Sequence, residues 1–198
     1  MTTSPASHSR LAPRTTAAPP PPPQAAPRRP WEPKPRVYLA GKIIGGGDWR
    51  EALVPGLGKE PFGCPIDCGK FIFTGPHFVP FQGKPHEWTG WHIGVQQRFD
   101  SVCPDGARPR WLVPALCLEW IRRSDLFFCW IDHSSCHGTL TEIGWAHMLG
   151  LPVYIAFAHC GLEMEMWFIR HGPRTLAREH SSAAEGLAHA LAWKAMLG

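Results

Sequence analysis

The chain has 198 residues, 44% of them hydrophobic and 18% charged, which suits one globular domain of ordinary size with an extension. The extension is residues 1–35, which hold half of the 22 prolines and, with five basic residues and one acidic residue, carry the formal net charge of +4. We expect a disordered, proline-rich, basic tail over 1–35 and a charge-balanced domain over 36–198, which excludes a basic groove for stable nucleic-acid binding. No run of about 20 apolar residues offers a membrane span and 1–35 contains no secretory apolar stretch, so we expect a cytoplasmic protein without membrane contact.

The first predicted strand covers residues 37–39. Three glycines at 45–47 loosen the following turn, and Asp48 is placed to cap a short helix that extends to Leu53. The amino end of this helix, together with Arg50, would favour an anion such as a phosphate. A plain cap is the alternative role for Asp48. The second strand is predicted over residues 70–73.

Residues 78–97 form a long stretch rich in Trp, Gly and His, which favours a functional loop or a lid over a binding crevice. Trp88 and Trp91 could stack a nucleobase there, although most of the tryptophans are expected in the core or in subunit contacts. A helix is predicted over 112–121 from apolar residues spaced one turn apart.

Residues 126–131 are a continuous apolar run of strand length, which is typical of a central parallel strand covered on both faces. Asp132 ends this run, residues 134–138 are small and polar, and helical spacing resumes from Leu140 to Leu149. A strand over 152–157 follows, and a helix over 182–196 closes the domain. We predict an α/β fold of three layers: a Rossmann/flavodoxin-like open parallel sheet of about four to five strands with helices on both faces.

Such sheets bind ligands in a crevice beyond the carboxyl ends of their strands, where we expect both Asp132 and Glu142 to lie. Glu142 is predicted in the first turn of its helix. A carboxylate there often serves only to complement the helix dipole or to cap an amide.

The local sequence favours a chemical role. Gly138-Thr139-x-x-Glu142-Ile143-Gly144-x-Ala146, preceded by Asp132 and matched by Val37-Tyr38-Leu39-Ala40-Gly41 on the first strand, resembles the nucleoside 2-deoxyribosyltransferase family. The resemblance runs discontinuously from about residue 36 to residue 168, and is strongest over 37–50 and 124–152. It implies that Glu142 is the nucleophile, that Tyr38 orients it, that no cofactor takes part, and that the chain forms a homo-oligomer.

The implied reaction breaks an N-glycosidic bond through an oxocarbenium-like sugar that Glu142 traps covalently, with retention of configuration after a second attack. A second base as acceptor would make the enzyme a transferase, and water would make it a nucleoside or nucleotide N-glycosidase. Asp132 is the predicted proton donor to the departing base, with His137 behind it. The predicted substrate-binding residues are Gly41, Asp48, Arg50, His137, Gly138, Thr139 and Trp88.

The chain also departs from the family. Residues 134–137 replace an acid that contacts the base in well-known members, and Cys117 falls near the position of another acid. The altered loop favours an alternative, namely a module that senses a nucleotide ligand without turnover and docks a partner through its proline-rich tail, or else a hydrolase with a changed substrate.

The cysteines offer two further alternatives. Their odd number, seven, indicates reduced thiols rather than a disulfide framework. Cys64-x-x-x-Cys68 with His77 or His86 could be half of a zinc site, but no second pair follows at ligand spacing, so we predict no metal. Cys136 in the crevice loop is a second potential nucleophile, without an evident base.

Overall fold

The computed structural model describes residues 34–42, 48–57, 63–77 and 113–197. Within these residues the strands are β1 (Arg36–Gly41), β2 (Ile66–Asp67), β3 (Ile72–Gly75), β4 (Leu126–Ile131), β5 (Val153–Phe157) and β6 (Thr175–Glu179). The helices are the 3-10 helix η1 (Trp49–Ala52), α1 (Val113–Arg122), α2 (His137–Met148), α3 (Cys160–Glu165), α4 (Trp167–Arg170) and α5 (Ala183–Met196). The predictions for residues 1–33 and 78–97, including Trp88, lie outside the described residues.

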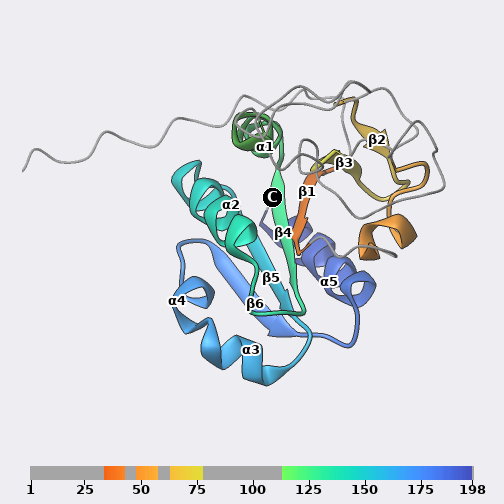
Figure 1. Ribbon diagram of the computed structural model, residues 1–198. Helices are drawn as coiled ribbons and strands as arrows, with labels where there is room; N and C mark the ends of the chain where they lie inside the picture. Colours follow the sequence, from red (N-terminus) through yellow and green to blue (C-terminus); the bar gives the residue numbers. More distant parts are fainter. Residues whose placement is uncertain (1–33, 43–47, 58–62, 78–112, 198) are drawn as a thin grey trace, which may run out of the picture.

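The described strands form one sheet in the order β2-β3-β1-β4-β5-β6 (Figure 1). β2 pairs antiparallel with β3, and the other neighbours pair in parallel. Counted along the chain, the five parallel strands run 2-1-3-4-5 across the sheet, which is the flavodoxin-like order. This order reverses direction between β1 and β4, so a ligand crevice is expected at the carboxyl ends of these two strands.

The predicted α/β architecture is confirmed, with six described strands rather than the expected four or five. The additional strands lie at the two edges. β2 has only two residues and β6 is only partly buried, so neither carries the apolar run that identifies a central strand. The second predicted strand is also displaced, because β3 begins at Ile72 rather than at residue 70.

Apolar side chains on the two faces of the sheet form two separate cores. On one face Tyr38 and Ala40 of β1 pack with residues of α1, α2 and α3, and on the other Val37 and Leu39 pack with residues that follow η1 and with α5. Alternation along β1 therefore sends Tyr38 towards α2, because successive strand residues point to opposite faces. β4 is buried along its whole length, as predicted.

None of the helices in the described part of the chain is long and apolar enough to cross a membrane.

Candidate functional site

A cavity of about 190 Å³ opens beyond the carboxyl ends of β1, β3 and β4. Its walls come from Gly41 and Lys42 after β1, Pro76 after β3, and the turn and first part of α2 after β4, as Ser135, Cys136, His137, Gly138, Thr139 and Glu142. The cavity therefore lies at the reversal of strand order, where open α/β sheets bind their ligands.

Glu142 forms one wall of this cavity and is held by Tyr38. The Tyr38 hydroxyl donates a hydrogen bond of 2.5 Å to Glu142 Oε1, a length typical of a hydroxyl bonded to a charged carboxylate. Glu142 lies in the second turn of α2 rather than the first, because the helix begins at His137. Glu142 is therefore not placed to cap the helix, because the free amides of a helix belong to its first turn.

Tyr38 is placed rigidly. Its side chain is fully buried and its ring stacks on Phe127 of β4 with 5.5 Å between ring centroids. Burial, followed by the charge of Glu142, raises the pKa of the Tyr38 hydroxyl well above its ordinary value. The hydroxyl therefore keeps its proton and acts as a hydrogen-bond donor to the carboxylate.

Cys117 of α1 is a third member of this group. Burial raises the pKa of the Cys117 thiol, followed by the charge of Glu142. Burial raises the pKa of Glu142 as well, while the hydrogen bond from Tyr38, the charge of Arg50 and a hydrogen bond from Cys117 oppose that rise. Cys117 therefore places a neutral thiol beside the carboxylate of Glu142.

Asp48 and Arg50 do not present their charges to the cavity. Arg50 is 0% exposed, and its guanidinium binds both oxygens of Asp48 at 2.9 and 2.8 Å. It also donates to the carbonyl oxygens of Leu39 and Gly41 at 2.7 and 2.8 Å. That these two residues bind a substrate stays a prediction, and the contacts of their polar atoms with one another and with the backbone of β1 do not support direct binding of an anion.

The alternative role of Asp48 is confirmed, since its side chain accepts a hydrogen bond from the amide of Arg50 and caps η1. The hydrogen bonds from the Arg50 guanidinium to the carbonyl oxygens of Leu39 and Gly41 tie η1 to the end of β1, and the charge of Arg50 lowers the pKa of Glu142. These two residues thus position the end of β1 beside the cavity.

The remaining predicted residues lie around the cavity in different ways. Gly41, His137, Gly138 and Thr139 line it, with His137 and Gly138 exposed and Thr139 buried. Gly41 has a φ of 153°, and a Cβ there would come within 2.7 Å of the Trp130 carbonyl oxygen, so glycine is required.

Asp132 follows β4 directly but is not among the residues that line the cavity. Its Oδ1 is buried and has no hydrogen-bond partner in the described part of the chain. The expectation that Asp132 and Glu142 share one cavity is therefore not met in the described geometry.

Lys42 was not predicted as a site residue, although its position directly after the first strand could have indicated it. Its ammonium group donates to Ser135 Oγ at 2.9 Å, and Ser135 in turn lies 3.0 Å from His133 Nδ1. The side chain brings a positive charge to the cavity wall.

The cysteine alternatives gain no support. Burial raises the pKa of the Cys136 thiol, which disfavours a nucleophilic thiolate. Cys64 is exposed, Cys68 is partly buried, and His77 is buried with its Nε2 at 3.1 Å from the Thr74 carbonyl oxygen. These residues do not appear among the described side chains that could gather around one metal ion.

Comparisons with known protein families, curated proteins and solved structures find no match to this chain.

Proposed function

We propose that this chain cleaves the N-glycosidic bond of a nucleoside or nucleotide through a covalent glycosyl intermediate on Glu142. One observation carries the proposal: the carboxylate of Glu142 lies at the wall of the crevice cavity and is held there by the hydroxyl of Tyr38 at 2.5 Å. A carboxylate so oriented beside a ligand-sized space is what capture of an oxocarbenium-like sugar requires.

In the first step a Glu142 oxygen bonds to the anomeric carbon as the bond from that carbon to the base nitrogen breaks, and the bonding electron pair leaves with the base. The nucleophile must be ionised for this attack. Burial raises the pKa of Glu142, and Tyr38, Arg50 and Cys117 each act against that rise, so these three residues favour the ionised carboxylate. Fixed donors of this kind need no rearrangement during the reaction.

The departing base needs a proton or a strong hydrogen bond. His137 lines the cavity and is exposed, whereas Asp132 does not line it, and the buried Oδ1 of Asp132 has no hydrogen-bond partner among the described residues. We propose that His137 contacts the base, and that Asp132 reaches it only after a movement of its side chain. Attack on the glycosyl ester by a second base or by water then releases Glu142, and two inversions retain the configuration.

The dimensions of the cavity suggest which part of the substrate it holds. Its volume of about 190 Å³ is below the ~300 Å³ at the lower end of pockets for drug-sized ligands. We propose that it holds the sugar and that the base lies towards His137. The positive charge of Lys42 at the wall favours a substrate with a phosphate on that sugar.

The test is intact-protein mass spectrometry after exposure to 2′-fluorinated deoxynucleosides and their 5′-phosphates, in which the second step is slow. We expect a sugar-sized mass gain on the wild-type protein and none on Glu142→Gln, because the neutral amide is nearly isosteric but a poor nucleophile. Glu51→Gln is the matched control, since Glu51 is an exposed glutamate outside the cavity, and it should form the adduct like the wild type.

A negative result would support the alternative function. If no adduct forms and no base is released from a broad panel of nucleosides and nucleotides, while the same compounds bind, the chain is a sensing module rather than an enzyme. An adduct that persists in Glu142→Gln would place the nucleophile elsewhere. The homo-oligomeric state stays a prediction, to be measured by light scattering on the eluting protein.

A further inference from the structure

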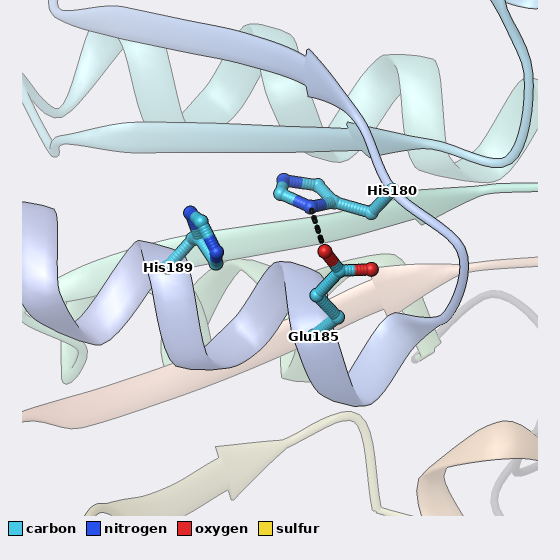
Figure 2. A group of neighbouring side chains, drawn as sticks. All are labelled: His180, Glu185 and His189. Carbon is cyan, nitrogen blue, oxygen red and sulfur yellow. Dashed lines mark ion pairs between the residues drawn. The ribbon is translucent and has the colours of Figure 1, made fainter.

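We propose that His180, Glu185 and His189 form a binding site for a divalent metal ion, and that this ion is Zn²⁺. Figure 2 shows the three side chains converging between the residue that follows β6 and the first turns of α5. One ligand atom from each of them can be chosen so that all three lie within 4.8 Å of one another. Two imidazoles and one carboxylate are a ligand set that zinc accepts, with the fourth position open.

One of the three distances is close to that of a filled site. Zinc binds nitrogen and oxygen at about 2.0–2.2 Å in a tetrahedral arrangement, which separates neighbouring ligand atoms by roughly 3.4 Å. His180 Nδ1 already lies 3.8 Å from Glu185 Oε1. A small rotation of the exposed side chains of Glu185 and His189 would complete the geometry.

His180 is the observation that a metal explains best. The residue is 6% exposed, and its buried Nδ1 has no hydrogen-bond partner among the residues that the structure describes. Its other ring nitrogen, Nε2, lies 2.9 Å from the hydroxyl of Tyr154. A histidine that binds a metal through one nitrogen usually has the other held by such a neighbour, which fixes the tautomer and the ring orientation. In the described structure Nδ1 is left facing the carboxylate at a distance too long for a hydrogen bond.

Glu185 is oriented in the same manner. Its Oε2 accepts hydrogen bonds from the amide and the hydroxyl of Ser181 at 2.9 and 2.6 Å, which leaves Oε1 directed at His180 (Figure 2). The serine hydroxyl of Ser182 caps the helix by accepting from the Glu185 amide. Capping accounts for the position of Glu185, but it does not account for the unbonded Nδ1 of His180.

His189 completes the set from one turn further along α5. It is exposed, and its ring lies 5.0 Å from that of His180 between centroids. Residues four apart on a helix lie on the same side, so Glu185 and His189 can bind one ion together. The ion would fasten α5 to the segment after β6, on the face of the sheet opposite to α2, and none of the three residues lines the cavity of Glu142.

The experiment is a calorimetric titration of the full, metal-free chain with Zn²⁺ under reducing conditions, repeated for three variants. We expect one tight site in the wild type. His189→Gln should weaken it more than ~100-fold, because loss of a neighbour that only orients a ligand already costs about 10–100-fold. Tyr154→Phe should weaken it within that smaller range, since it removes the hydroxyl that holds His180. His171→Gln, an exposed histidine elsewhere, should leave the affinity unchanged.

Substitution with Co²⁺ identifies the ligands independently of affinity. Binding through nitrogen and oxygen gives d–d absorption bands without the thiolate charge-transfer bands that cysteine ligands produce. The proposal is overturned if no stoichiometric binding occurs, if His189→Gln or Tyr154→Phe binds as tightly as the wild type, or if thiolate bands accompany the bound ion. Circular dichroism of each variant shows that a lost site does not reflect a lost fold.

Discussion

Tyr38→Phe tests whether the hydroxyl of Tyr38 keeps Glu142 charged. The substitution removes one oxygen from a fully buried ring and leaves its stacking on Phe127 in place. A hydrogen bond to a charged group contributes about 1.5–3 kcal/mol, against about 0.5–1.5 kcal/mol for a neutral pair. The 2.5 Å contact with Glu142 Oε1 has the length of the charged kind.

The expected loss depends on pH. The hydrogen bond from Tyr38 lowers the pKa of Glu142, although burial leaves that pKa above its ordinary value of 4.5. The stabilisation from this bond is therefore full while Glu142 is ionised in the folded protein, and it declines as the pH falls through the raised pKa. We expect Tyr38→Phe to lower the free energy of unfolding by ~1.5–3 kcal/mol at mildly alkaline pH, and by less near pH 4.5.

The assay is urea unfolding at both pH values, in the wild-type and in the Glu142→Gln background. In the latter the acceptor is neutral, so the cost of Tyr38→Phe should fall to about 0.5–1.5 kcal/mol and lose its dependence on pH. The pKa of Glu142, followed by NMR of the labelled carboxyl carbon, should rise in Tyr38→Phe. An equal loss at both pH values and in both backgrounds would refute the reasoning, because it would assign the effect to packing rather than to the charge on Glu142.

Two further predictions concern a buried ion pair and the packing of helices α5 and α2. Asp48→Asn removes the carboxylate charge that pairs with the buried guanidinium of Arg50 at 2.8 Å, so urea unfolding should show a loss of ~3–5 kcal/mol; a loss near zero would mean that the pair is not closed to water. Gly186→Ala would bring a Cβ within 2.7 Å of a side chain of β5, which should cost about 1–3 kcal/mol. Gly144→Ala, whose Cβ would meet no atom within 4 Å in the described part of the chain, should instead stabilise α2 by about 0.5–1 kcal/mol; equal effects of the two alanines would contradict the packing shown.

The sequence predicted the centre of the fold better than its edges. β4 and β5 carry unbroken apolar runs and were placed within a residue or two. A strand that is buried on both faces is apolar throughout, so it can be recognised without knowing which elements pack against it. β6 was not predicted, since an edge strand is paired on one side only and its sequence need not be apolar. The start of α2 was placed too late because His137 and Gly138 carry no apolar spacing.

In the site, too, some features could be predicted from the sequence and others arise only on folding. The proximity of Tyr38 and Glu142 was expected from the resemblance, and the strand order brings them together. The burial of Arg50 was not foreseen, because a charged side chain is ordinarily exposed unless a specific partner is present. Asp48 is such a partner and is visible in the sequence, but the carbonyl oxygens of Leu39 and Gly41 that also accept from Arg50 come close only once the chain has folded. The grouping of His180 with α5 is likewise a product of the fold.

The enclosure of Arg50 has a consequence for how the site responds to its surroundings. Dissolved ions weaken interactions between exposed charges over about 8–10 Å at ordinary salt concentrations, but they reach buried charges far less. Arg50 acts on Glu142 from a position with no exposed surface, so its influence is shielded from ionic strength. Lys42 is partly exposed, and its attraction for an anionic ligand fades as salt is added. The ionisation of Glu142 therefore depends little on ionic strength, whereas the proposed binding of a charged ligand beside Lys42 weakens as the salt concentration rises.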